Sequence, residues 1–329
     1  MGIRIAGIGG YVPAKTLTNL ELAMQVDTSD EWITSKTGIV ERRIAGPEEA
    51  PSDLGCQAAL RCLAQAGVDK AAVDLVIVAC ATPDQSQPAV ACLVQEKLGI
   101  SGGQCPAFDV NSVCAGFVFA LNVAQGMMLT DRARYKNVLV IGTDTFSKIL
   151  NWKDRRTCVF FGDGAGAVLL QQRDDSDLRF HFHLGSDGRG REYIAVPGGG
   201  TRLPISPEVV EKRLNKFVMN GPKVWEFAVN TVPETIRTLL REHDLVPSDL
   251  DLLILHQSNL RMLEAIMTSL ELPMSKTVTT IETYGNTAAA SIPLTLQKAW
   301  EEGRLTAGTK IMLCGFGGGL SWGAALFDW

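Results

Sequence analysis

A long apolar run, residues 113–129, constrains this chain more than any other feature of its sequence. Polar side chains interrupt it only near Asn122 and Gln125, so a helix formed here has no face suited to water. The apolar residues 107–110 just before it indicate a strand that turns at 111–112. We therefore expect a strand, a tight turn and a helix buried in the centre of the domain.

Cys114 stands at the start of this helix. Free backbone N–H groups and the positive end of the helix dipole are expected to stabilise a thiolate there and to lower the pKa of the thiol. Ala115 and Gly116 are small enough to let a substrate lie against the sulfur. The other seven cysteines fall mostly in apolar segments without a C-x-x-C pair, which indicates free thiols in a reducing cytoplasm. Cys114 is thus our candidate nucleophile.

The composition excludes several classes of protein. A formal charge of −5 without a basic stripe argues against general nucleic-acid binding. We find no window of about 18 residues free of polar interruption, and so expect no membrane span. The first ten residues indicate a strand and a glycine turn rather than a signal peptide. A chain of 329 residues suits one large α/β domain or two fused halves.

Three segments of the first half recur in the same order in the second. The pairs are VDLVIVACATPD with LDLLILHQSNL, NSVCAGFVFAL with YGNTAAASIPLTL, and FFGDGAGAVLL with GFGGGLSWGAALF. These echoes predict a duplicated α/β fold with halves 1–172 and 173–329. They also place Asn286 where the first half has Cys114. Residues 189–216 have no counterpart and are expected to form a long loop or lid.

Strands are expected at 2–8, 75–81, 138–141, 157–161 and 252–255, and the GDGAG sequence at 162–166 is expected to turn into a strand at 165–170.

His256 ends the apolar strand 252–255, the position where α/β proteins carry ligand-binding groups. A single strand-end histidine is more often structural, and Asn286, before a run of small residues, is more often a helix N-cap. If both meet Cys114 where the halves touch, the three groups would make an acyl-transfer site. The alternating His181 and His183 lack the acidic or thiol partners of a metal site, so we expect no metal.

Glycine runs occur in both halves. The sequence around Gly162 fits a loose dinucleotide pattern but continues as a strand, so it does not support nucleotide binding. The run 317–319 lets the backbone approach a ligand and direct N–H groups at an oxyanion.

Several long segments resemble the 3-oxoacyl-acyl-carrier-protein synthase III family of the thiolase-like superfamily. They are LTNLELAMQVDTSDEWITSKTGIVERRIA, DVNSVCAGF, DRRTCVFFGDGAGAVLL, LHQSNLRML, YGNTAAASIPLTL and GFGGGLSWGAALF, and the likeness runs nearly end to end. The resemblance implies a thiolase-like fold. Its two duplicated halves would hold mixed five-stranded sheets in an α-β-α-β-α arrangement.

The resemblance also implies a decarboxylating condensation that begins fatty-acid-type synthesis. Cys114 would take an acyl group from acyl-CoA. His256 and Asn286 would bind the thioester carbonyl of malonyl-acyl carrier protein, whose carbanion attacks the acyl group. The backbone of Gly318 would help to bind the tetrahedral oxygen, and Phe316 would shield the malonyl carboxylate. Acyl-CoA is then a substrate, and no cofactor is bound permanently.

Further positions carry over from the same resemblance. Trp32 and Arg155 would enclose the adenine of CoA, and Thr28, Gly221 and Asn259 would line the pantetheine tunnel. Lys36 and Trp225 would lie near the mouth of that tunnel. Arg261 would dock the carrier protein, and residue 87 would reach across a homodimer into the primer pocket.

Departures from the family pattern leave the primer open. Gln87 replaces a Phe that closes the acyl pocket. Glu226 replaces a docking Lys and Lys36 replaces an Arg near the CoA mouth, changes expected to weaken or redirect carrier recognition. A dicarboxylic primer such as glutaryl-CoA, in pimeloyl (biotin) synthesis, is therefore an alternative, with Lys148 as its carboxylate partner. The sequence is also compatible with a secondary-metabolite pathway, with acyl transfer to an alcohol or amine without condensation, and with an inactive partner subunit.

Overall fold

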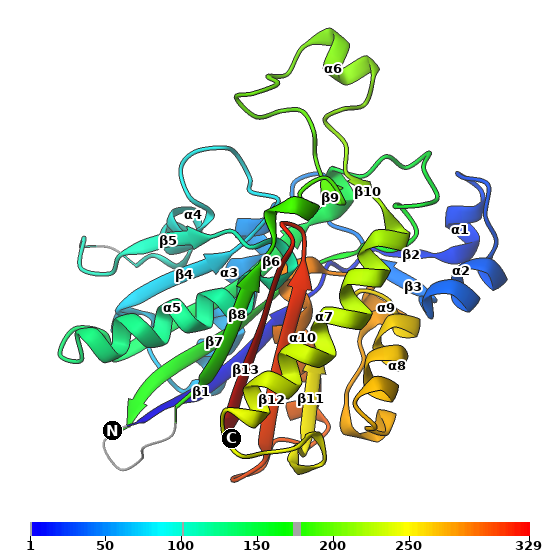
Figure 1. The fold of residues 1–329 in the computed structure, drawn as a ribbon. Coiled ribbons are helices and arrows are strands. Elements are labelled where there is room, and N and C mark those ends of the chain that lie inside the picture. The colour runs from blue at the N-terminus through cyan, green and yellow to red at the C-terminus, as the bar shows by residue number, and fades with distance from the viewer. Residues whose placement is uncertain (1, 101, 174–178) are drawn as a thin grey trace.

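The structure, a computed structural model, describes residues 2–100, 102–173 and 179–329. Two mixed sheets form its centre (Figure 1). The first has the order β1 (Gly2–Tyr11), β7 (Asp163–Arg173), β6 (Asn137–Thr145), β4 (Leu75–Ala79) and β5 (Ala107–Val110). The second has the order β11 (Leu252–Leu255), β12 (Lys310–Gly317), β13 (Ser321–Asp328) and β8 (His181–Ser186). Two small ribbons pair β2 (Thr16–Thr18) with β3 (Glu41–Arg43) and β9 (Ile194–Ala195) with β10 (Val218–Met219).

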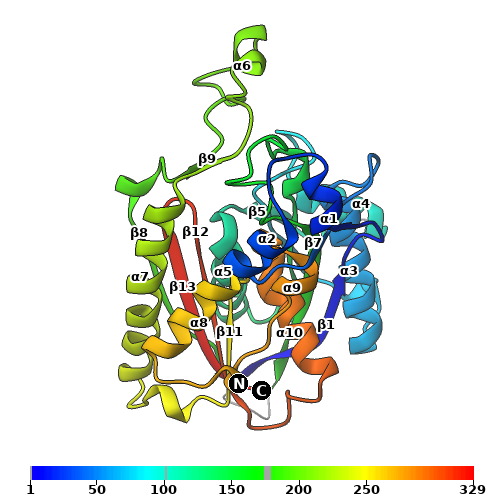
Figure 2. The same cartoon turned by 90° about the vertical axis from the view of Figure 1, so that its right-hand side faces the viewer.

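Helices separate and cover the two sheets, which gives the predicted α-β-α-β-α layers (Figure 2). The outer layer on the first sheet is α3 (Pro51–Ala66) and α4 (Val90–Leu98), the central layer is α5 (Gly116–Thr130) and α10 (Ser291–Glu301), and the outer layer on the second sheet is α7 (Gly221–Arg241) and α8 (Leu260–Ser269). The short helices are α1 (Asn19–Ala23), α2 (Asp30–Thr37), α6 (Pro207–Glu211) and α9 (Ile281–Tyr284). Single 3-10 turns are Lys70–Ala72, Val113–Ala115, Phe146–Lys148, Gly188–Gly190, Pro247–Asp249, Met274–Lys276 and Ala288–Ala290.

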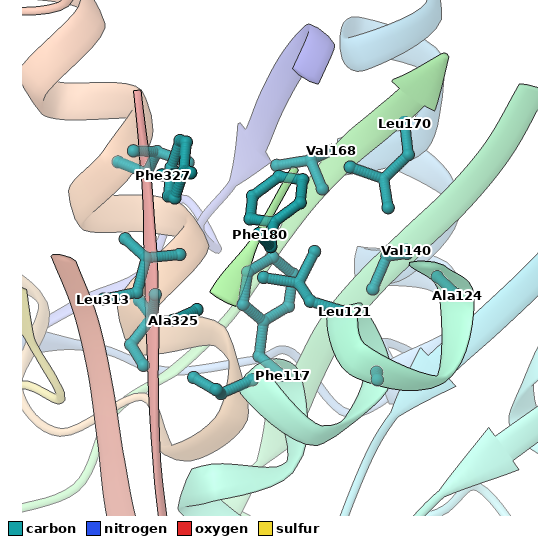
Figure 3. Close-up of a cluster of buried hydrophobic side chains, with 14 of the residues drawn as sticks. Phe117, Leu121, Ala124, Val140, Val168, Leu170, Phe180, Leu313, Ala325 and Phe327 are labelled. Atoms are coloured by element: carbon teal, nitrogen blue, oxygen red, sulfur yellow. The ribbon is translucent and has the colours of Figure 1, made fainter. Parts of the chain in front are cut away.

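Helix α5 is buried between the sheets, as its apolar sequence predicts. Phe117 and Leu121 have no exposed surface, and side chains of both sheets surround them (Figure 3). Burial of one such side chain contributes about 1.5–3 kcal/mol. By length and composition alone, Val113–Thr130 is apolar enough to cross a membrane. Its packing between two sheets accounts for that composition.

The second sheet has four strands among the described residues, whereas five were predicted. The segment 277–280 runs beside β11 but is held by side chains instead of a main-chain ladder. The hydroxyl of Thr277 donates to the carbonyl of Leu253 at 2.6 Å, and the side-chain oxygen of Gln257 accepts from the backbone N–H of Thr280 at 2.9 Å.

Two local predictions around GDGAG were wrong. Residues 157–160 form turns, with the N–H groups of Thr157 and Cys158 donating to the carbonyl of Asp154. Strand β7 already begins at Asp163, so most of GDGAG lies within it. The glycines serve close packing: a Cβ on Gly166 would lie 2.7 Å from the Cβ of Pro293 in α10.

The repeat aligns differently from its prediction at the two turns before α5 and α10. Val113 and Ala288 have nearly the same positive φ, 47° and 49°. Their N–H groups donate to the side chains of Asn111 and Asn286, at 3.1 and 2.9 Å. Asn286 therefore corresponds to Asn111, not to Cys114, whose counterpart is Ala289. The division at 172/173 stays a prediction.

The segment 189–216, expected to be a loop or lid, forms an arm that extends away from the sheets and carries α6 (Figures 1 and 2). The N–H of Gly198 donates to the carbonyl of Leu214 at 2.7 Å and closes the arm at its base. The β9–β10 ribbon joins the arm to the body.

Candidate active site

One cavity of about 750 Å³ contains all three predicted catalytic groups, since Cys114, His256 and Asn286 line it together. Cys114 comes from the turn before α5, His256 from the end of β11, and Asn286 from the turn before α10. Other lining residues are Trp32, Ser35, Lys36, Val113, Phe146, Phe160, Phe161, Ile194, Phe217, Met219, Gly221, Pro222, Val224, Trp225, Ser258, Asn259, Arg261, Met262, Phe316 and Gly317.

Cys114 is 6% exposed and lies against the backbone of Gly317. A Cβ on Gly317 would be 2.8 Å from the Cys114 Cβ and 3.2 Å from its sulfur, so only glycine fits there. Burial, together with the nearby charge of Asp144, raises the pKa of the Cys114 thiol. The prediction that the helix start lowers this pKa was therefore wrong, because burial of the sulfur disfavours its charged form.

His256 is a neutral imidazole held at one nitrogen. Burial lowers its pKa to about 3. Its Nδ1 lies 2.7 Å from the hydroxyl of Ser291, at the start of α10, which leaves Nε2 for the cavity. The ring meets the ring of Phe316 edge-on, with centroids 5.2 Å apart.

The side-chain oxygen of Asn286 is hydrogen-bonded within its own turn, and its NH2 group is not. Its backbone N–H donates to the carbonyl of Phe160 at 2.8 Å, and its carbonyl accepts from Gly162 at 3.0 Å. Its Oδ1 accepts from Ala288, so the amide oxygen has the capping role expected of an Asn before a helix. The NH2 group remains as a donor for the cavity, beside neutral His256. Two such donors suit an oxygen that gains negative charge.

Of the residues predicted to assist these groups, Phe316 lines the cavity and Gly318 does not. Gly318 lies close behind it, where a Cβ would meet Val113 and Ile194 at 3.4 and 3.3 Å. Its role in binding an oxyanion stays a prediction.

The predicted CoA-binding residues divide into two groups. Lys36, Gly221, Trp225 and Asn259 line the cavity together with Trp32. Asn259 also caps α8 through its side-chain oxygen, 2.8 Å from the N–H of residue 261.

Arg155 and Thr28 lie outside the cavity lining. The guanidinium carbon of Arg155 is 5.3 Å from the centroid of the Trp32 ring. A flat base between them needs about 7 Å, twice a van der Waals separation, so CoA would have to part the pair. The hydroxyl of Thr28 is buried and has no hydrogen-bond partner among the described residues. A ligand bound here would satisfy it.

The predicted docking residue Arg261 is already paired. Its guanidinium donates to both carboxylate oxygens of Glu264, at 3.0 and 2.9 Å, and to the carbonyl of Ser35. Lys223 and Glu226 form a second pair at 2.9 Å. A carrier that docks here must compete with these acidic side chains.

Neither residue expected to admit an unusual primer lies in the cavity lining. Gln87 is exposed. Lys148, expected as a carboxylate partner, donates instead to the backbone carbonyls of Pro47 and Glu49, so that expectation was wrong.

Sequence reasoning missed the aromatic side of the cavity. Phe146 and Phe161 stack with centroids 4.7 Å apart, and Phe217 meets both edge-on. Phe217 directly follows the arm, at a position for which the sequence yields no prediction. Ser291 was missed as well, although its place at the start of a helix opposite a strand-end histidine was a usable signal.

Within the described ranges, no three His, Cys, Asp or Glu side chains gather closely enough to hold a metal ion. His181 does pack on His243, with ring centroids 4.0 Å apart.

Comparisons with known proteins agree with this geometry. The pattern described as 3-oxoacyl-[acyl-carrier-protein] synthase III matches residues 108–188, and that of its C-terminal part matches 240–329. The beta-ketoacyl-[acyl-carrier-protein] synthase III of Desulfitobacterium hafniense is 45% identical over 100% of this chain and 98% of that protein. The protein of the same name from Caldanaerobacter subterraneus is 44% identical over 99% of this chain and 97% of that protein. The crystal structure of the Aquifex aeolicus 3-oxoacyl-[acyl-carrier-protein] synthase III has a TM-score of 0.91 and 38% identity, covering 100% of both chains.

Proposed function

Because this chain belongs to the 3-oxoacyl-[acyl-carrier-protein] synthase III family, it is a condensing enzyme that joins an acyl-CoA primer to malonyl-acyl carrier protein, and we propose that Cys114, His256 and Asn286 carry out this reaction. The observation that carries the proposal is their presence around one cavity.

In the first step Cys114 takes the acyl group. Its sulfur bonds to the acyl carbon, the bond from that carbon to the sulfur of CoA breaks, and the thiol proton ends on the departing CoA. Since burial keeps the thiol protonated, its proton passes to the sulfur of CoA as that sulfur leaves.

In the second step the malonyl group loses CO2. The electron pair of the broken carbon–carbon bond moves onto the thioester oxygen, where His256 Nε2 and the NH2 group of Asn286 donate. The carbanion then attacks the acyl carbon on Cys114, and the sulfur leaves and takes up a proton. Phe316 packs edge-on to His256 and keeps the reacting carboxylate in an apolar setting, which favours loss of its charge.

The primer we propose is short and apolar. Phe146, Phe161 and Phe217 form an aromatic wall near Cys114, and a free carboxylate beside them would be costly to desolvate. Lys148, expected to pair with the carboxylate of a glutaryl primer, is bonded to backbone carbonyls instead. Acyl transfer without condensation is also less favoured, because it includes no loss of CO2, the step in which the NH2 group of Asn286 would stabilise the thioester oxygen.

The remaining parts of the proposal concern partners and place. We propose acyl-CoA as a substrate rather than a resident cofactor, bound along Trp32 and Lys36. Exposed Gln87 would reach a second copy in a homodimer, and Arg261 would meet the acidic carrier at the cavity mouth. All eight cysteines are free, which supports a reducing cytoplasm.

A primer panel tests the proposal. The chain is incubated with acetyl-, octanoyl- or glutaryl-CoA, and its intact mass is measured, with Cys114→Ala as the control. We expect an acetyl adduct that is absent from the control. A glutaryl adduct without an acetyl one would overturn the apolar primer. Condensation that persists in Cys114→Ala would remove Cys114 from its role.

A further inference from the structure

Asp144 is a fully buried carboxylate that the steps above do not use. It lies near the end of β6 with no exposed surface. Among the described residues no Lys, Arg or His forms an ion pair with it. Burial raises its pKa to about 6, so it is costly to keep charged here.

Its two oxygens hold two different parts of the molecule. Oδ1 accepts from the N–H groups of Ala81 and Thr82, at 2.9 and 3.0 Å, and from the Thr82 hydroxyl at 2.7 Å. These donors follow β4 in the first sheet. Oδ2 accepts from the N–H of Ala289 at 3.0 Å, across a separation of 145 residues.

Ala289 lies in the 3-10 turn that positions Asn286. The preceding N–H of this turn, that of Ala288, donates to the Asn286 oxygen at 2.9 Å and so orients its NH2 group. Strand β6 also supports the turn sterically. A Cβ on Gly142 would lie 2.3 Å from the carbonyl oxygen of Ala289, and Gly142 shares a strand face with Asp144.

We propose that Asp144 is a positioning residue, which holds the amide of Asn286 in place from strand β6 by fixing the Ala288–Ala290 turn. The inference rests on the proposed function for the step it should affect. That step is the loss of CO2, which Asn286 serves, and not the acylation of Cys114.

The variant Asp144→Asn isolates this contact. An Asn side chain has one accepting oxygen and one NH2 group. Keeping its oxygen on the three donors of residues 81 and 82 turns the NH2 group against the N–H of Ala289, so two donors face each other and the turn is released. The variant also removes a negative charge near Cys114, a charge that opposes thiolate formation.

Asp163→Asn is the matched control. Asp163 is equally buried, and its carboxylate accepts from Ala45 at 2.7 Å and from Ser147 at 2.9 Å. Both donors, Ala45 and Ser147, lie in the predicted first half of the chain, and neither belongs to the turns that carry Cys114 or Asn286.

Two partial reactions are measured in each variant: Cys114 adduct formation by intact mass, and CO2 release from malonyl-carrier by the acylated enzyme. For Asp144→Asn we expect CO2 release to fall by about tenfold or more, with adduct formation no slower than in the wild type. Amide hydrogen exchange in a peptide covering 284–291 should also become faster. Asp163→Asn should show neither change.

Equal loss of both partial reactions, or unchanged CO2 release, would overturn the proposal. If Asp144→Asn does not fold, Gly142→Ala is used, since its methyl group displaces the same turn and should give the same selective loss. If both variants misfold, Asp144 is needed for stability of the fold, and the positioning role is rejected. If the wild type shows no condensation, the proposed function fails, and hydrogen exchange alone decides the role of Asp144.

Discussion

The hydroxyl of Ser291 should matter for condensation although it touches no substrate. It lies 2.7 Å from His256 Nδ1, and both side chains are almost fully buried. When the hydroxyl donates to Nδ1, the proton of the neutral ring lies on Nε2, where it can donate to a thioester oxygen. Ser291→Ala leaves Nδ1 without this partner. A buried polar group that loses its partner costs about 1–3 kcal/mol, so we expect kcat/KM for malonyl-carrier to fall about tenfold.

The assay compares condensation with acylation of Cys114 in the same preparation. Acylation should stay within about twofold, because the carbonyl and hydroxyl of Ser291 have no hydrogen bond with Cys114. Thr295→Val is the control: Thr295 is as buried and donates to the carbonyl of Ser291 at 2.8 Å, but its hydroxyl forms no hydrogen bond with His256. Wild-type condensation in Ser291→Ala, or the same loss in Thr295→Val, would refute the reasoning.

Three further predictions concern the sulfur, the CoA site and pH. Gly317→Ala should slow Cys114 adduct formation at least about tenfold, because its Cβ would lie 2.8 Å from that of Cys114; an unchanged rate would contradict the geometry. Trp32→Ala should raise KM for acyl-CoA about tenfold, since stacking of a base contributes about 1–3 kcal/mol, with kcat nearly unchanged in steady-state kinetics; a fall in kcat alone would place Trp32 elsewhere in the reaction. His256→Gln should weaken the acid dependence of stability in urea unfolding. As pH falls from about 6.5 toward 3, His256 becomes protonated in the unfolded chain but stays neutral in the folded one. The free energy of unfolding therefore falls by up to about 1.4 kcal/mol per pH unit. An equally steep dependence in the variant would show that His256 is not the group responsible.

Periodic and repeated features of the sequence predicted most of the architecture. The apolar run before residue 130 became the buried helix α5, and β11 spans the predicted strand Leu252–Leu255. The same features brought Cys114, His256 and Asn286 to one cavity. The prediction of α5 succeeded because burial between two sheets demands a continuous apolar sequence.

The failures have local physical causes. GDGAG has the composition of a turn, but its glycines make room for α10 against β7, a tertiary contact that sequence does not display. The helix start at Cys114 favours a thiolate, yet full burial raises the thiol pKa, and burial depends on the whole fold. The repeat paired Asn286 with Cys114 because both precede helices, whereas the backbone angles of Val113 and Ala288 fix a different register.

The division of labour between Cys114 and Asn286 can be measured in a single turnover. Enzyme whose Cys114 carries an acetyl group is mixed with malonyl-carrier, and loss of the adduct is followed by mass. Wild type should discharge the adduct into 3-oxoacyl-carrier, whereas Asn286→Ala should load normally and retain it, discharging at least about a hundredfold more slowly. Discharge of the Asn286→Ala adduct at the wild-type rate would contradict the account.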